Sequence, residues 1–252
     1  MVFSWSVFFH YLLEPSQIYL NGLFLTLSIT IVSEAFGTII GLAIAMMRLS
    51  SHRALSGFAQ LYAWIFRGTP LLVQVVFIYT ALAAAGIFRF QDIDIGFLTI
   101  PGNIQAGIVA LSLNEAAYMG EIIRAGIMAV DKGQREAAQS LGMPPALLMR
   151  RIVLRQAARI IIPPLGNNIN GMLKNTTLLS VIGVPELLLA TQMVTSATFR
   201  VFELYAVVAI YYLTLTTLWS VVQARIETYF DKPYSNRVQR ASAGGPGLLP
   251  HG

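Results

Sequence analysis

Long apolar runs, separated by short polar segments, set the pattern of the chain. Residues 18–47 contain Glu34 as their one ionisable group, and residues 68–88 and 205–223 contain none. A membrane-spanning helix needs roughly 20 predominantly apolar residues. We therefore predict spanning helices at about 18–47, 58–88 and 203–225. Gly68 and Pro70 suggest a kink within the second of these.

Two further apolar segments carry polar interruptions. Residues 104–130 include Glu115, Glu121 and Arg124, and this segment spans if those side chains face protein or water. In the segment "IIIPPLGNNINGMLKNTTLLSVIGVPELL" we expect the helix to be interrupted at Pro163, Pro164, Gly166 and Gly171. Broken backbone at membrane depth must be buried in protein or line a cavity. These two segments bring the prediction to five spans in an all-α, polytopic membrane helix bundle.

Basic residues collect in the segments after the first, third and fifth spans, and that placement predicts the orientation. The most basic segment is 132–159, whereas 89–103, with its two aspartates, suits an external loop. Cytoplasmic loops of membrane proteins carry the excess of lysine and arginine. We therefore expect an external segment at 1–17, a transmembrane domain at 18–230 with a cytoplasmic loop at about 131–155, and a cytoplasmic, disordered tail at 231–252.

Composition agrees with a membrane protein. Of the 252 residues, 56% are hydrophobic and only 12% are charged, against roughly 25% charged in soluble domains. The mean hydropathy is +0.65. The net charge of +5 reflects topology, because the basic residues flank the spans, and it does not indicate nucleic-acid binding. The absence of cysteine excludes disulfides, thiolate metal sites and a cysteine nucleophile.

The cytoplasmic loop has the signals of two short helices. Asp131 followed by Gln134 resembles a capping box, and Gly142 stands where a left-handed residue ends a helix. Pro144 and Pro145 suit the first turn of a second helix. The loop is therefore predicted to be a compact helix–glycine–helix knob, with small alanines beside Glu136 that allow close approach of a partner.

Four motifs in this order resemble a known family. "FRGTPLLVQ" (66–74), "NEAAYMGEIIRAGI" (114–127), "EAAQSLG" (136–142) and "IPPLGNNINGMLKNTTLLSVIG" (162–183) are similar to motifs of the polar amino-acid branch of ATP-binding-cassette importer permeases, with the MetI-like fold. The resemblance extends from about Asn21 to Arg225. One departure is Arg155 in "IVLRQA", where the family has proline, and it puts the local kink before the fourth span in doubt.

The resemblance implies a function and its partners. In this family the loop is a coupling helix in a groove of a cytoplasmic ATPase, here with Glu136, Ala137, Ala138, Leu141 and Gly142. The chain lacks a Walker A loop, so it would be a non-catalytic subunit without a cofactor of its own, and ATP would bind to two copies of a separate ATPase. An extracytoplasmic amino-acid-binding protein and a second permease, identical or related, complete the complex expected in the bacterial inner membrane.

Polar groups inside the spans are the candidates for the substrate path. At about 1.5 Å per residue, Glu115 lies roughly 16 Å and Glu34 roughly 21 Å into their spans, near the midplane. The candidates are Glu34, Arg67, Glu115, Asn167 and Asn168. Each has a structural alternative, namely a bond to a neighbouring helix or to backbone freed by the prolines. Glu121 and Arg124 are expected to pair with each other.

Two other function classes remain alternatives. In an ion-coupled secondary transporter of amino acids, Glu34, Glu115 and Glu121 would carry protons, but such a carrier needs no docking knob. An intramembrane enzyme is disfavoured because the three histidines lie outside the predicted spans and no metal-ligand spacing is present.

Overall fold

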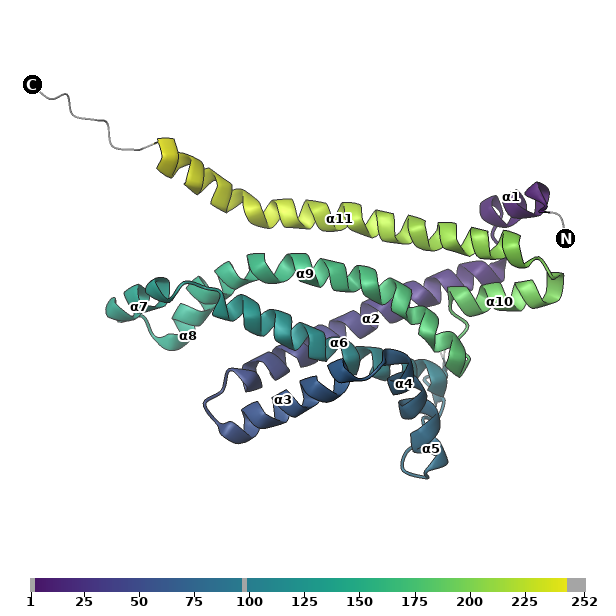
Figure 1. Ribbon diagram of the computed structural model, residues 1–252, viewed down its shortest axis with the longest axis horizontal. Coiled ribbons are helices and arrows are strands. Elements are labelled where there is room, and N and C mark those ends of the chain that lie inside the picture. Colours follow the sequence, from purple (N-terminus) through teal and green to yellow (C-terminus); the bar gives the residue numbers. More distant parts are fainter. Residues whose placement is uncertain (1–2, 97–98, 244–252) are drawn as a thin grey trace, which may run out of the picture.

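The computed structural model describes residues 3–96 and 99–243, and this part of the chain is a helical bundle with one short hairpin (Figure 1). The first half contains α1 (Trp5–Leu13), α2 (Gln17–Arg48), α3 (Arg53–Gly68), α4 (Leu71–Val76), the π-helical turn η1 (Phe77–Ala81) and α5 (Leu82–Ala84). Strands β1 (Ile93–Asp94) and β2 (Thr99–Ile100) pair antiparallel. The second half contains α6 (Gly102–Met128), α7 (Lys132–Ser140), α8 (Pro145–Leu148), η2 (Met149–Val153), α9 (Leu154–Asn175), η3 (Thr176–Ile182), α10 (Leu187–Thr198) and α11 (Val201–Ala243). The predicted all-α class is confirmed.

Helices α2 and α6 form the centre of the bundle and run in the same direction. A Cβ atom placed on Gly37 would lie 2.7 Å from Cβ of Glu115, and one on Gly41 would lie 2.7 Å from Cβ of Met119. Only glycine permits backbones to approach this closely, and small residues four apart are a common device of membrane helix pairs. The contacts at Gly37 and Gly41 therefore determine which part of α2 lies beside Glu115.

The second predicted span is two helices rather than one. Helix α3 and the α4–α5 segment meet at an angle of 106°. Thr69 between them is extended (φ −118°, ψ 147°), because a residue before proline avoids the helical region, and Pro70 begins the next helix. The kink expected at Gly68 and Pro70 is confirmed, and a single helix over 58–88 is wrong.

The prolines of the fourth segment do not break the helix. Helix α9 continues through Pro163 and Pro164, and the chain turns later, at Gly183 (φ 78°), before α10 leaves at 51°. Neighbouring helices can stabilise proline-containing spans, and here Trp219 of α11 donates from Nε1 to the Gly166 carbonyl over 2.7 Å. The interruptions predicted at Pro163, Pro164, Gly166 and Gly171 are therefore wrong, and the chain turns instead at Gly183.

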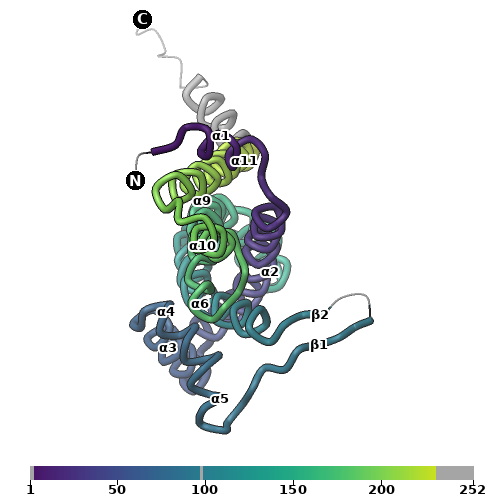
Figure 2. The backbone as a smooth tube through the Cα atoms, turned by 90° about the vertical axis from the view of Figure 1, so that its right-hand side faces the viewer, coloured from purple at the N-terminus to yellow at the C-terminus, as the bar shows by residue number. Residues whose placement is uncertain are grey.

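Helix α11 is longer than the span predicted at 203–225. It continues to Ala243, so residues 231–243 of the predicted tail are helical, and residues 244–252 lie outside the described part. Its first turns hold the N-terminal helix α1, where the Ser4 backbone N–H donates to Glu203 Oε1 over 2.9 Å. Figure 2 shows α1 and α11 together on one side of the bundle and α3, α4 and the hairpin on the other.

Length and apolar composition support membrane insertion. Within the described residues, α2 and the Val201–Phe230 part of α11 are long and apolar enough to cross a membrane, and two bent pairs raise the number to four. The bent pairs are α3 with α4–α5, and Pro145–Ile182 with α10. Helix α6 passes no such test, but its 27 residues correspond to about 40 Å. It corresponds to the third predicted span and packs along α2, where Glu115 is only 7% exposed.

Candidate substrate cavity and coupling surface

A polar cavity of about 380 Å³ opens between the start of α4, the middle of α6 and α9. It brings together three of the predicted substrate-path residues, Glu115, Asn167 and Asn168. The other lining residues are Thr69, Pro70, Leu71, Asn114, Tyr118, Gly171 and Asn175. Asn168 Nδ2 donates to Glu115 Oε1 over 2.6 Å, which orients the carboxylate and leaves its second oxygen for another donor.

Side-chain amides fix the bend that forms one wall of this cavity. Gln74 Nε2 donates to the Phe66 carbonyl over 2.8 Å and to the Thr69 carbonyl over 3.0 Å. Asn114 Nδ2 donates to Gln74 Oε1 over 3.0 Å and to the Phe66 carbonyl over 3.1 Å. The backbone groups exposed by the break at Pro70 thus bond to side chains, and α6 holds the bent span in place.

Glu34 does not line the cavity. It lies on α2 at 6% exposure, and neither carboxylate oxygen has a hydrogen-bond partner among the described residues. The structure thus separates the two carboxylates that the sequence placed at similar depth, since only Glu115 faces open space.

Arg67 faces a second cavity, of about 420 Å³, which it lines together with Arg48 and Trp64. Its guanidinium carbon lies 5.6 Å from the ring centre of Tyr118, a cation–π distance. Tyr118 lines both cavities. Tyr118, which is 42% exposed, therefore borders both a cavity with a carboxylate and a cavity with two arginines.

The predicted pair on α6 forms and includes a third charge. Arg124 donates to Glu121 Oε1, and Arg48 Nη1 of α2 lies 3.5 Å from Glu121 Oε2. This network joins the ends of α2 and α6, which agrees with the structural interpretation of Glu121 and Arg124.

The predicted helix–glycine–helix knob is present as α7, Gly142 and α8. Asp131 Oδ1 accepts from the Gln134 N–H over 3.2 Å at the start of α7, and Gly142 has φ 73° after its end. A residue with a Cβ is strained at this φ. The sequence signals for both ends of α7 are therefore confirmed.

The five predicted coupling residues do not share one face. Glu136, Ala137 and Gly142 are exposed, and Leu141 is 86% exposed. Ala138 is only 4% exposed and packs in a core cluster with Ile127 and Val153. Ala138 thus attaches α7 to its own bundle, and the other four residues form the surface open to a partner.

Two arginines near this loop have different places. Arg135 of α7 donates to the carbonyl of Ile127 at the end of α6, a contact between two helices for which the local pattern carries no signal. Arg155 is exposed on α9, where the helix continues without interruption from the π-helical turn η2. The arginine thus stands in regular helix, as expected for a position that has lost its proline.

Glu186 is a structural residue that the sequence interpretation missed. It is fully buried, accepts from the Leu188 and Leu189 N–H groups over 2.9 and 2.8 Å, and accepts from the Tyr212 hydroxyl over 2.9 Å. An acidic residue before the apolar run 187–190 is a helix-start signal. The carboxylate caps α10 and ties it to α11.

The helical bundle, its open polar cavity and its exposed helical knob define a membrane transport subunit. A family model described as "Binding-protein-dependent transport system inner membrane component" matches residues 37–231, and the chain belongs to this family.

Curated relatives match over most of the chain. The arginine transport system permease protein ArgU of Corynebacterium glutamicum is 40% identical over 212 residues, which are 82% of this chain and 66% of ArgU. The probable glutamine ABC transporter permease protein GlnM of Bacillus subtilis is 35% identical over 223 residues, which are 88% of this chain and 98% of GlnM.

Solved structures share the fold. An amino acid ABC transporter crystallised with histidines matches with a TM-score of 0.79 at 38% identity, covering 91% of this chain and all of that chain. The inward-facing MetNI methionine ABC transporter matches with a TM-score of 0.69 at 18% identity, covering 86% and 98% of the two chains. The second likeness is one of fold alone.

Proposed function

We propose that this chain is the permease subunit of an ATP-driven importer for polar amino acids with neutral or cationic side chains. The observation that carries the proposal is the cavity around Glu115. Among the described residues, Glu115 is its one carboxylate, no lysine or arginine lines it, and four asparagines do. The names of the relatives, which specify arginine and glutamine transport, support the same substrate class.

The chemistry of the cavity suggests how such a substrate binds. The free oxygen of Glu115 takes a substrate ammonium or guanidinium group, and the amides of Asn167 and Asn175 donate to the substrate carboxylate. An acidic side chain would place a second negative charge near Glu115, without a compensating cation, in a partly buried site. The cavity therefore disfavours aspartate and glutamate.

The coupling knob supplies the connection to ATP. The chain has no phosphate-binding glycine–lysine loop, so ATP binding and hydrolysis belong to separate ATPase subunits that dock on Glu136, Ala137, Leu141 and Gly142. Each chain offers one knob, so a core of two permeases serves two ATPases, and an external binding protein delivers the amino acid. The attachment of α7 to α6 through Arg135 and Ala138 passes its movement to the helix that carries Glu115.

We further propose that the amino terminus is external and the carboxyl terminus cytoplasmic. The α2–α3 turn, the α7–α8 knob and the C-terminal part of α11 lie at the same end of the bundle (Figure 1). These are the basic segments of the sequence, and the positive-inside rule assigns that end to the cytoplasm. The test is to attach a membrane-impermeant label to an engineered cysteine at position 252. Labelling in intact cells would contradict the proposed orientation.

Glu115→Gln tests the binding role. Glutamine keeps the oxygen that accepts from Asn168 but loses the charge, so we expect uptake of arginine at limiting concentration to fall by about ten- to a hundredfold, as for a lost charged hydrogen bond. Glu14→Gln is the matched control, because Glu14 is exposed at the outer end. Equal uptake by Glu115→Gln and Glu14→Gln over a panel of amino acids would remove Glu115 from the site.

Gly142→Val tests the docking role, with Gly142→Asn as its control. Valine is strained at φ 73° whereas asparagine tolerates the left-handed region. We expect the valine variant to insert in the membrane but to lose ATPase in pull-down experiments, and the asparagine variant to retain it. ATPase recovery with the valine variant at the wild-type level would contradict docking at the knob.

A further inference from the structure

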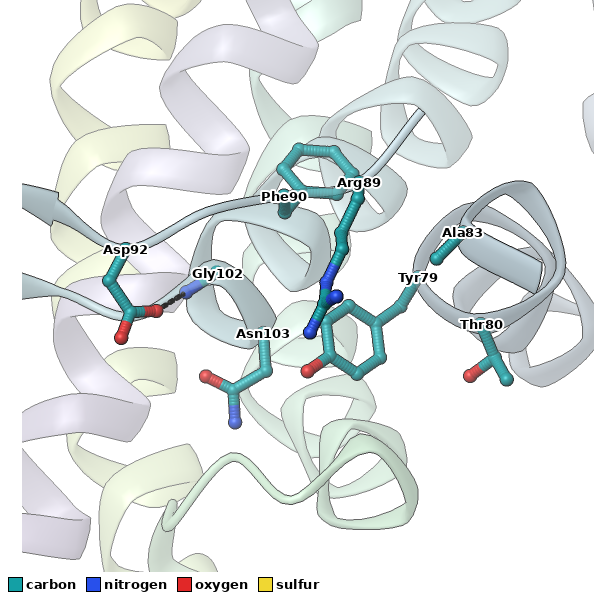
Figure 3. A pocket seen from close by; sticks show the side chains of 8 residues that line it. All are labelled: Tyr79, Thr80, Ala83, Arg89, Phe90, Asp92, Gly102 and Asn103. Carbon is teal, nitrogen blue, oxygen red and sulfur yellow. Dashed lines mark hydrogen bonds between the residues drawn. The ribbon is translucent and has the colours of Figure 1, made fainter. Parts of the chain in front are cut away.

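A separate cavity of about 540 Å³ lies at the opposite end of the bundle from the knob, between η1, the loop before β1 and the start of α6. Tyr79, Thr80, Arg89, Asp92 and Asn103 are among its lining residues (Figure 3). Its volume is in the range of small-molecule sites, roughly 300–1,000 Å³. The cavity combines one positive and one negative side chain.

The negative side chain is held by the backbone of α6. The Gly102 N–H donates to Asp92 Oδ1 over 2.8 Å, and no described residue donates to the second carboxylate oxygen. Gly102 is required for this close approach, because a Cβ at this position would lie 2.5 Å from the Phe90 carbonyl oxygen. The chain thus orients Asp92 at the cavity and leaves half of its acceptor capacity free.

The positive side chain points into the same cavity. Figure 3 shows the Arg89 guanidinium between the Tyr79 ring and Asn103. Among the described residues no carboxylate forms an ion pair with Arg89, Asp92 included. Two opposite charges therefore face one open volume without neutralising each other.

The Asn103 amide lines the cavity, but its hydrogen-bonding groups are occupied by backbone partners. Its Nδ2 donates to the carbonyls of Gly183 and Ile182 over 2.9 and 3.3 Å, and its Oδ1 accepts from the Ile104 N–H over 2.9 Å. The cavity is therefore anchored to the turn after η3, and its charged side chains are those of Arg89 and Asp92.

A free α-amino acid matches this pair, because it carries a carboxylate and an ammonium group on one carbon. Arginine donates a planar pair of N–H groups to a carboxylate, and an aspartate oxygen accepts from an ammonium. We infer that this cavity is an outer recognition site for α-amino acids, with the carboxylate at Arg89 and the ammonium at Asp92. The inference rests on the proposed import of amino acids, and the site precedes the Glu115 cavity by roughly 18 Å along α6.

Photolabelling tests the site without any need for transport. The probe is a diazirine analogue of lysine, applied to the purified permease–ATPase complex in the absence of binding protein and ATP. We expect labelled peptides from 77–92 as well as from the Glu115 cavity. Arg89→Gln and Asp92→Asn should each reduce labelling of 77–92 at least fivefold, while Asp94→Asn, outside the cavity, should not. Asparagine at position 92 keeps an oxygen for the Gly102 N–H.

Competition and a second variant separate the outcomes. Excess arginine should suppress labelling of 77–92, and arginine amide, which lacks the carboxylate, should not. Arg89→Lys keeps the positive charge but loses the planar pair of N–H groups, so it should reduce labelling less than Arg89→Gln does. Labelling that is equal in all variants, or suppressed equally by the amide, overturns the inference. The inference is also overturned if Arg89→Gln leaves labelling unchanged but weakens capture of the binding protein in a separate pull-down. That result would mean that the surface serves protein docking. Wild-type uptake, measured separately, reports on the proposed function itself.

Discussion

Gly37→Ala tests whether the close contact of α2 and α6 supports both the fold and the site. The new Cβ would lie 2.7 Å from Cβ and Cγ of Glu115 and 3.3 Å from the Ser112 carbonyl oxygen. Carbon atoms in contact stand about 3.5–4.0 Å apart, so one helix must move by about 1 Å. Overpacking of this kind costs about 1–3 kcal/mol. Because the contact is with Glu115 itself, we expect lower arginine uptake as well.

Gly57→Ala is the matched control for this substitution. Gly57 is also inside a helix, but a Cβ there meets no atom within 4 Å, so alanine should stabilise α3 by about 0.5–1 kcal/mol. The assay is thermal unfolding of the purified protein in detergent, where each kcal/mol corresponds to roughly 2–4 °C in a chain of this size. A Gly37→Ala protein as stable as Gly57→Ala would refute the account of the α2–α6 contact.

Two further substitutions test other contacts. Glu186→Ala should lower the free energy of unfolding by about 2–4 kcal/mol, because two helix N–H groups and the Tyr212 hydroxyl lose a buried acceptor. Glu186→Gln should lose less stability. Equal thermal stability of the alanine variant and wild type would exclude the capping role. Tyr118→Ala should widen the connection between the two cavities that Tyr118 borders and increase passive efflux of labelled arginine from loaded vesicles, whereas Tyr118→Phe keeps the ring and should not. Unchanged efflux in both variants would exclude a barrier role for the ring.

The features that the sequence predicted correctly depend on local signals. Asp131, Gly142 and Pro145 specify the two ends of the knob through backbone conformation and capping, which involve residues close in the chain. The Thr69–Pro70 step likewise specifies the break after α3, because proline restricts its own and the preceding residue's conformation. Each of these features appears in the structure where the local rule placed it.

The features that were missed depend on contacts between distant helices. Pro163 and Pro164 obey the same local rule as Pro70, yet α9 stays helical with α11 packed alongside it. Glu34 and Glu115 have similar depths, and only their rotation about α2 and α6, set by glycine contacts, places one in the cavity and the other in the core. The local sequence around Arg89 and Asp92 does not predict that both line one cavity, because that cavity is formed only when η1 and the start of α6 come together.

The central claim is that this chain imports amino acids with the energy of ATP hydrolysis. It is tested most directly in proteoliposomes that contain the permease, its ATPase and the binding protein, with ATP inside the vesicles and labelled arginine or glutamine outside. We predict accumulation against a gradient that requires ATP hydrolysis, persists when ionophores collapse proton and sodium gradients, and is lost in Gly142→Val. Uptake that needs no ATP and disappears with the ionophores would contradict the claim and indicate an ion-coupled carrier.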